Sequence, residues 1–275
     1  MRVAAIQLCS GANIEKNLAD TAAYIQAAAE DEAKLIVLPE NFALLSRDER
    51  AKVVAKEAPL QGPIQAFLAQ MAKEHKVWIV GGTIPMVSPN PDKVRAACLL
   101  FNDEGICVAR YDKLHLFDVT VTEKEKYAES AAIERGENIV TLQTPFAHIG
   151  FAVCYDVRFP ELFRVMHTQG ANLLVLPSAF TLTTGRAHWH VLVRARAIEN
   201  LSFMIAAGQA GHHEAGRDTY GHSLIVDPWG NILAEADDHT PGFIAADLDF
   251  AAQDKWRQTL PTGSHRRIIV PGSLN

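Results

Sequence analysis

Short apolar runs alternate with helix-like stretches along the whole chain, and this alternation constrains the fold more than any other feature. Runs such as VAAIQL, KLIVLPE, NLLVLPSA and SLIVDP are apolar at consecutive positions. Strands have this pattern when both faces of their sheet are covered. Two short connections, DEG and PWG, contain a glycine and favour antiparallel hairpins. The sequence therefore predicts an α/β fold with a mixed sheet.

Helix signals lie between these runs. Asn13 is a candidate N-cap, and Pro63 and Pro160 suit a first helical turn. We expect helices over residues 14–33, 63–76, 160–169 and 185–200. No linker-like stretch interrupts the chain, so residues 1–275 are expected to form one domain. The C-terminal tail, residues 260–275, is a candidate to reach a neighbouring subunit.

Two segments repeat one pattern at the ends of predicted strands. AKLIVLPEN (33–41) and ANLLVLPSA (171–179) are identical at five of nine positions, and each follows a predicted helix. A match this short also arises by chance. If it reflects structure, the chain contains two similar α-β halves, and Glu40 and Ser178 occupy corresponding strand ends. Ligands of open α/β sheets gather at the carboxyl ends of strands, so Ser178 is a candidate substrate-binding residue.

Composition argues against several classes of partner. The chain has a formal net charge of −6, a pI near 6.0 and no basic block, so nucleic acid is not an expected partner. No apolar run has the roughly 18 residues that a membrane span needs. The N-terminal apolar run is too short for a signal peptide. Without an export signal, the four cysteines are expected to be reduced thiols in the cytoplasm.

Three predicted strands end on a reactive side chain: Glu40 after LIVLP, Lys113 after VARYD and Cys154 after GFAV. Each has a plain structural explanation, namely a turn cap, a solvated charge and a core thiol. Together they suit covalent catalysis, because a thiol with a pKa near 8.5 needs a base or a cation close by. Glu40 would take the proton, and burial would have to raise its pKa for that task. Lys113 and the backbone N–H of Tyr155 would stabilise an oxyanion.

Other chemistries have weaker signals. The eleven histidines allow a Cys–His pair, but none has a distinctive local pattern. His188 and His190 are two apart, which on a helix points them to different faces. The chain has no HExxH, no CxxC and no GxGxxG, so we expect no metal site and no cofactor. A redox-sensing role for Cys154 lacks a resolving cysteine near it.

The combination LPEN, YDKLHLF, CYDVRFPEL and GHSLIVDPWG resembles the nitrilase superfamily of carbon–nitrogen hydrolases over nearly the whole chain. The resemblance implies a four-layer α-β-β-α sandwich with two mixed sheets. It implies a catalytic set of Glu40 as base, Lys113 as oxyanion stabiliser and Cys154 as nucleophile. A second family glutamate corresponds to Glu129, which would orient Lys113 or the incoming amine. The resemblance also suggests a homodimer or larger homo-oligomer.

Within the superfamily, PSAFTLTTGRAHWHVLVRARAIEN resembles deaminated-glutathione amidases most, with ω-amidases next. Related sequences commonly read Gly-Pro-Ala-His-Trp-Glu where this chain reads GRAHWH, which places Arg186 and His190 at departures from the pattern. Arg186 is either a surface charge or an anchor for a substrate carboxylate. The expected reaction is hydrolysis of the terminal amide of a small oxo acid, deaminated glutathione first, through a thioester.

Alternatives to this substrate and to the amidase activity stay open. They are α-ketoglutaramate or α-ketosuccinamate, an N-carbamoyl or nitrile substrate, and, from another class, a non-catalytic interaction module on the same scaffold.

Overall fold

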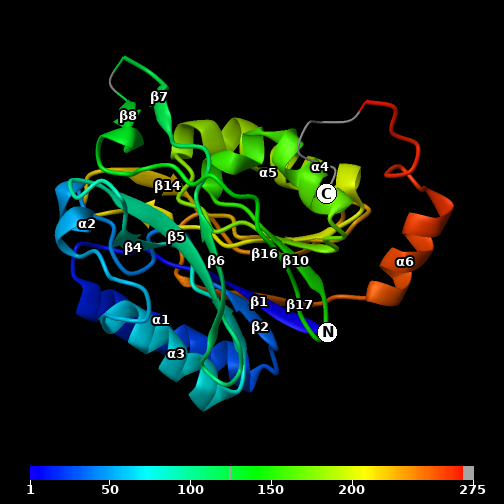
Figure 1. The fold of residues 1–275 in the computed structure, drawn as a ribbon, viewed down its shortest axis with the longest axis horizontal. Coiled ribbons are helices and arrows are strands. Elements are labelled where there is room, and N and C mark those ends of the chain that lie inside the picture. Colours follow the sequence, from blue (N-terminus) through cyan, green and yellow to red (C-terminus); the bar gives the residue numbers. More distant parts are fainter. Residues whose placement is uncertain (124, 269–275) are drawn as a thin grey trace.

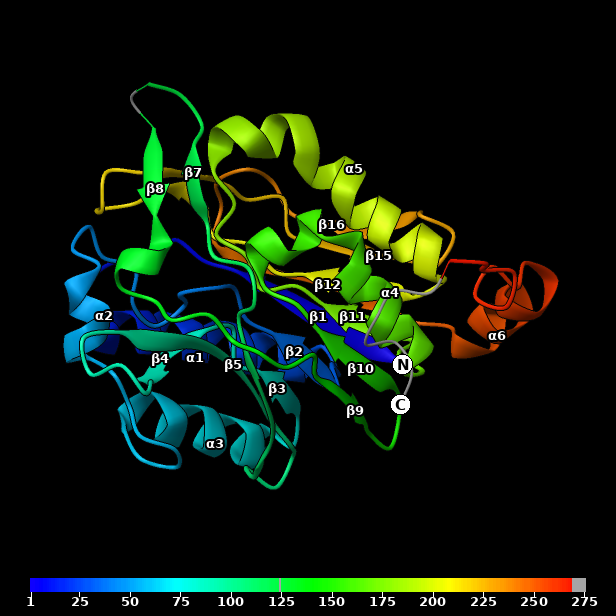
Figure 2. The same cartoon turned by 45° about the horizontal axis from the view of Figure 1, so that its top comes forward.

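The computed structural model describes residues 1–123 and 125–268. Two mixed sheets lie face to face between two layers of helices (Figures 1 and 2). This is the four-layer α-β-β-α sandwich that the sequence resemblance implied. No helix in the described part of the chain is long and apolar enough to cross a membrane.

Each sheet has a parallel centre and antiparallel edges. Across the first sheet the strands are β17 (Gly242–Asp247), β1 (Arg2–Gln7), β2 (Leu35–Val37), β3 (Trp78–Val80), β5 (Val94–Phe101) and β4 (Ile84–Val87), and β6 (Cys107–Asp112) also pairs with β5. Across the second they are β16 (Ile232–Glu235), β15 (Leu224–Val226), β12 (Phe203–Ala206), β11 (Leu173–Val175), β10 (His148–Phe151) and β9 (Thr141–Gln143). In each, three consecutive strands are parallel: β1–β2–β3 and β10–β11–β12.

The repeated segments occupy the central strands of these two parallel triplets, β2 and β11. The likeness of the two halves is therefore structural. The predicted hairpins also form, because β5 pairs antiparallel with β6 across DEG and β15 pairs antiparallel with β16 across PWG.

Alternate residues of the central strands face two different cores. In β1, Val3 and Ala5 pack between the two sheets, whereas Ala4 and Ile6 pack under the outer helices. All four are completely buried. This is why the strand runs are apolar at every position and not at every second one.

Six helices occur in the described residues. They are α1 (Ile14–Glu30), α2 (Arg50–Val54), α3 (Pro63–His75), α4 (Pro160–Thr168), α5 (Leu182–Asn200) and α6 (Phe250–Thr259). The α1 and α3 helices cover the first sheet and α4 and α5 cover the second (Figure 2). The side chain of Asn13 accepts from Lys16 N at 3.0 Å, and Pro63 and Pro160 begin α3 and α4, as predicted.

The helices differ from the predictions at several places. The α1 helix ends at Glu30 and not at 33, and α3 and α4 each end one residue before the predicted end. The α5 helix begins at Leu182 and not at 185, because the Thr181 side chain caps it. Helices α2 and α6 are absent from the sequence predictions. The α6 helix lies beside the sandwich (Figure 1), and its sequence is largely polar. The expected tail is described as far as residue 268, and residues 269–275 lie outside the described part.

Smaller elements surround one end of the sandwich. Two short hairpins, β7 (Asp118–Thr120) with β8 (Lys126–Ala128) and β13 (Ala210–His212) with β14 (Asp218–Tyr220), stand next to the start of α5. Two 3-10 turns are η1 (Glu129–Ala131) and η2 (Cys154–Arg158). These elements supply part of the wall of the site described below.

Candidate active site

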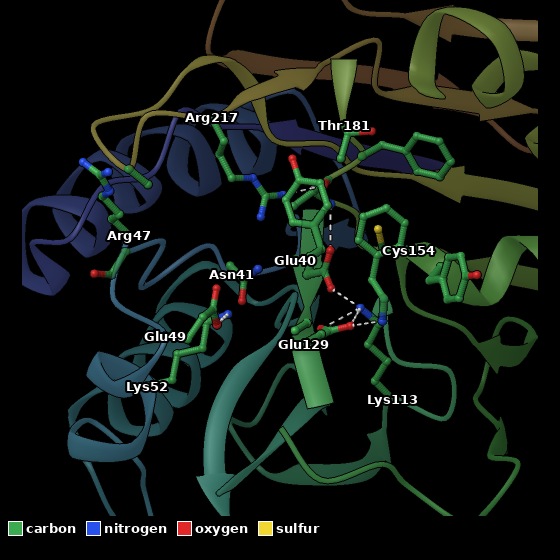
Figure 3. A pocket seen from close by; sticks show the side chains of 18 of the residues that line it. Glu40, Asn41, Arg47, Glu49, Lys52, Lys113, Glu129, Cys154, Thr181 and Arg217 are labelled. Carbon is green, nitrogen blue, oxygen red and sulfur yellow. Dashed lines mark hydrogen bonds and ion pairs between the residues drawn. The ribbon is translucent and has the colours of Figure 1, made fainter. Parts of the chain in front are cut away.

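Three segments that are distant in sequence meet at the carboxyl ends of strands from both sheets. Glu40 follows β2, Lys113 follows β6 and Cys154 follows β10. Figure 3 shows the three side chains pointing toward one another, with Glu129 of η1 beside them. Glu40 also joins the repeated segments, because its Oε2 accepts from Ala179 N at 2.8 Å.

Lys113 connects two carboxylates in a place that water barely reaches. Its Nζ lies 2.8 Å from Glu40 Oε1 and donates to both oxygens of Glu129, at 2.8 and 2.9 Å. Lys113 is 2% exposed and Glu40 3%. Glu129 Oε2 also accepts from Phe117 N at 2.6 Å, which fixes its orientation. Each buried charge therefore has a partner of opposite sign, as burial requires.

The charges hold the free site as a carboxylate, an ammonium and a thiol. Burial alone would raise the pKa of Glu40, but the charge and hydrogen bond of Lys113 outweigh it and hold that pKa below its usual value. Burial alone would lower the pKa of Lys113, yet Glu129 and Glu40 raise it well above the usual value. Burial and the nearby Glu40 charge raise the pKa of the Cys154 thiol.

This corrects one sequence expectation. The sequence implied that burial would have to raise the pKa of Glu40 if this carboxylate was to take a proton from sulfur. The pKa is lowered instead, because Lys113 donates directly to the carboxylate. The proton therefore stays on sulfur in the free protein. Its transfer to Glu40 must accompany attack on a substrate, when a developing oxyanion shares the charge of Lys113.

Cys154 occupies a strained turn that exposes its sulfur to the cavity. Its φ is +48°, a left-handed value that few residues other than glycine adopt. The backbone is held there by a hydrogen bond from Cys154 N to Pro177 O at 2.9 Å. Such strain persists only where the surroundings determine the conformation, and it concentrates at functional sites.

Asp156 joins the cysteine turn to the lysine segment, a role that was not predicted from the sequence. Its carboxylate is completely buried, and it accepts from Val153 N at 2.8 Å and from the Tyr111 hydroxyl at 2.6 Å. It also accepts from His115 N at 3.1 Å. Tyr111 and His115 flank Lys113, so Asp156 fixes the distance between Lys113 and Cys154. The feature of the sequence that could have indicated this role is an acidic residue two positions after the nucleophile.

Glu40, Lys113, Glu129 and Cys154 line a cavity of about 280 Å³. Its other walls come from the loop before α2, the β7–β8 hairpin, the start of α5 and the loop before β14. These walls contain Asn41, Ser46, Arg47, Glu49, Lys52, Phe117, Lys126, Tyr127, Ala128, Tyr155, Ala179, Phe180, Thr181, Thr184, Ala215 and Arg217. A cavity of this size suits a small molecule.

Three cations of the wall have no acidic partner among the described residues: Arg47, Lys126 and Arg217. Arg217 donates to Ala179 O at 2.7 Å and lies over the Tyr127 ring. Its Nε is shielded from solvent and has no hydrogen-bond partner in the described part of the chain. An orphaned guanidinium N–H beside a cavity is suited to a carboxylate ligand.

The remaining predicted site residues are Tyr155, Ser178 and Arg186, and they differ in whether they line the cavity. Tyr155 lines the cavity, and its backbone N–H has no acceptor among the described residues. Ser178 is completely buried and donates to Leu176 O at 3.2 Å, outside the cavity wall. Arg186 is exposed on α5 and also lies outside the wall. The geometry gives Ser178 and Arg186 no contact with the cavity, and Arg217 is the better placed cation.

Fold and site together define a class of enzyme, the hydrolases that act on carbon–nitrogen bonds. The family model of the carbon–nitrogen hydrolases matches residues 2–258, and the chain belongs to this family. Deaminated glutathione amidase of Yersinia enterocolitica is 39% identical over 97% of this chain and 93% of that protein. Omega-amidase NIT3 of Saccharomyces cerevisiae is 36% identical over 100% of this chain and 96% of that protein.

The solved structures agree with this assignment. The crystal structure of Saccharomyces cerevisiae Nit3, a member of branch 10 of the nitrilase superfamily, superimposes with a TM-score of 0.87 at 34% identity. The superposition covers 98% of this chain and 97% of the yeast chain.

Proposed function

We propose that this protein is a cysteine-dependent amidase that hydrolyses the terminal amide of a small oxo-acid substrate through a thioester. One observation carries the proposal: a buried ammonium lies 2.8 Å from each of two carboxylates, on the wall of the cavity that holds Cys154. Buried charges stabilise a fold little compared with apolar packing. Their convergence with a thiol in a cavity supports a catalytic use.

The first half of the reaction forms the thioester. Cys154 Sγ bonds to the amide carbon while its proton passes to Glu40, and the carbonyl electrons move onto oxygen. The oxyanion is stabilised by the Lys113 ammonium and the Tyr155 N–H, and loss of one such donor typically costs about 2.7–4 kcal/mol. The carbon–nitrogen bond then breaks, and nitrogen takes the proton from Glu40 and leaves as ammonia.

The second half releases the acid. Glu40, again a carboxylate, takes a proton from water, and the hydroxide attacks the thioester carbon. The carbon–sulfur bond breaks, and the proton that Glu40 took from water passes to sulfur, which restores the thiol and the carboxylate. Glu129 acts as a positioning residue, because it holds Lys113 with two hydrogen bonds and contacts the reacting atoms only through it.

The cations of the cavity wall favour the binding of an anionic substrate. Arg47, Lys126 and Arg217 supply positive charge, and the Arg217 Nε has an unused N–H. An oxo acid carries a carboxylate that a guanidinium binds through charge-assisted hydrogen bonds. We assign this anchoring role to Arg217, in the place where the sequence suggested Arg186.

Two substrate candidates follow from the relatives. Deaminated glutathione is the first, since the Yersinia relative bearing that name is 39% identical over nearly the full length. An ω-amidase activity on α-ketoglutaramate or α-ketosuccinamate is the second, since the yeast relative of that name is 36% identical over the full chain. Nitriles and N-carbamoyl compounds use the same reaction centre and belong in the assay panel.

The test is product release from each compound by the wild type and by Cys154→Ala. We expect turnover of an oxo-acid amide by the wild type and a loss of at least about 10⁴-fold in the variant. Cys9→Ala is the matched control, because Cys9 lies outside the cavity wall, and it should keep full activity. Equal turnover by Cys154→Ala would end this mechanism, and inactivity on the whole panel would favour the interaction module.

We also propose that the chain forms a single domain and acts as a homodimer or larger homo-oligomer in the cytoplasm. Two apolar side chains of α5, Val191 and Ile198, are 67% and 44% exposed, which supports a contact with a second copy. All four cysteines are unpaired, which suits a reducing compartment. Light scattering on the purified protein tests the oligomeric state.

A further inference from the structure

A second cluster of reactive side chains lies outside the catalytic cavity. His190 of α5, His222 after β14 and Glu235 at the end of β16 bring their ligand atoms within 4.8 Å of one another. His190 Nε2 and His222 Nδ1 each lie 2.8 Å from the same oxygen, Glu235 Oε1. The three residues come from three separate elements, which is why the sequence gave no sign of the cluster.

We propose that His190, His222 and Glu235 bind a divalent transition metal, with Zn²⁺ as the best match to the ligands. Two imidazole nitrogens and one carboxylate oxygen form a donor set that zinc accepts, and a water completes a tetrahedron. Zinc–ligand bonds of about 2.0–2.1 Å put tetrahedral ligands about 3.3 Å apart. The observed separations of 2.8 Å therefore need to open by only about half an ångström.

The surroundings hold the three ligands and leave the ion a way in. His222 has a strained φ of +50°, fixed by a bond from its N–H to Asp237 O at 3.0 Å and from Trp189 Nε1 to its carbonyl at 2.7 Å. The Tyr220 ring packs against both imidazoles. The three side chains are 24–34% exposed, so an ion and its water can enter from solvent.

The proton balance also permits metal binding. Without a metal, both ring nitrogens face one carboxylate oxygen as hydrogen-bond donors. Coordination needs the lone pair of each nitrogen, so the proton of each neutral imidazole must sit on its other nitrogen. Those other nitrogens have no hydrogen-bond partner among the described residues, and no interaction there opposes the change. Protons compete with the metal, so binding should weaken in acid.

The ion would clamp elements that also carry the catalytic cavity. Thr181 and Thr184 at the start of α5 line that cavity, as does Arg217 just before β14. The cluster ties α5 to the segment after β14 and to β16. Its role is therefore structural support beside the active site and not contact with the reacting atoms.

The experiment is a titration of chelator-treated protein with Co²⁺, whose visible absorption reports tetrahedral coordination. The Cys154→Ala background removes the catalytic thiol as a competing ligand. We expect about one Co²⁺ per chain, displaced by Zn²⁺, and a rise in Tm on adding Zn²⁺ because the metal binds the folded state. Loss of the signal in Cys154→Ala alone would place the ion in the catalytic cavity and overturn the proposal.

Variants locate the ion. In the same background, His190→Ala and His222→Ala should each weaken Co²⁺ binding at least 10- to 100-fold, roughly the cost of losing even an outer-shell partner. Glu235→Gln keeps side-chain volume and both imidazoles, and it covers the case in which a histidine variant fails to fold. His239→Ala is the control, because His239 belongs to a separate exposed cluster with Asp237 and Asp238. Co²⁺ binding that is kept in Glu235→Gln and lost in His239→Ala would overturn the proposal. The absence of any Co²⁺ binding to the protein would also overturn it.

Discussion

Glu40 and Glu235 each accept hydrogen bonds from basic side chains, but they do so in very different surroundings. Glu40 is almost fully buried and faces a lysine that is also buried. The Glu235 side chain is 34% exposed and faces two histidines. In both, burial opposes ionisation and hydrogen-bonded partners more than offset it, so both pKa values are lowered. We therefore expect the loss of a partner to matter more at the buried Glu40 than at the partly exposed Glu235.

The largest difference between the two carboxylates should appear in activity. Glu40→Gln removes the proposed base while keeping the side-chain volume, and the loss of a general base typically costs about 10²–10⁴-fold in rate. Glu235→Gln should leave kcat and KM nearly unchanged, because Glu235 lies outside the cavity wall. Steady-state kinetics on the two variants measure the contrast. A similar loss in both would show that the two clusters are not independent.

The next effect concerns stability. Lys113→Met leaves Glu40 and Glu129 buried without a counter-charge, and breaking a buried ion pair costs about 3–5 kcal/mol. His190→Ala removes one partner of a half-exposed group and should cost less than about 1 kcal/mol without metal. Urea unfolding of both variants gives the free energies. Lys113→Met as stable as the wild type would mean that the two carboxylates are protonated or reach water.

The pH dependence of stability should also separate the two sites. Because the pKa of Glu40 is lower in the folded state, its contribution is present above the unfolded value of about 4.3 and is lost as pH falls through the folded value. The wild type should therefore lose more stability than Glu40→Gln between about pH 5 and pH 3. The same comparison with Glu235→Gln should show a smaller gap, because solvent screens Glu235. Urea midpoints across this range give the measurement.

The smallest expected effect is on substrate affinity. Arg217→Lys keeps a positive charge at the cavity wall but loses the planar guanidinium and its unpartnered Nε–H, so KM for an oxo-acid amide should rise by about tenfold with a smaller change in kcat. Arg186→Lys on the exposed surface of α5 is the control and should leave KM unchanged. A rise in KM for Arg186→Lys alone would restore the anchor that the sequence first suggested.

Much of the fold could be predicted because its signals are local. The apolar runs marked the central strands, Asn13, Pro63 and Pro160 marked helix starts, and the glycine turns marked two hairpins. The exposed α6 escaped prediction because its sequence is largely polar. Thr181 sets the start of α5 through a side-chain cap three residues earlier than the pattern indicated.

The sequence by itself determined which reactive groups end the strands, since Glu40, Lys113 and Cys154 each stand where an apolar run stops. Only the tertiary structure decided what these groups do to one another. Contact between Lys113 and Glu40 lowers a pKa that burial alone would raise, and the Asp156 carboxylate joins two segments 45 residues apart. The cluster of His190, His222 and Glu235 likewise exists only once α5, the segment after β14, and β16 pack together. Electrostatic energies depend on distance and burial in space, and neither quantity is written in the order of residues.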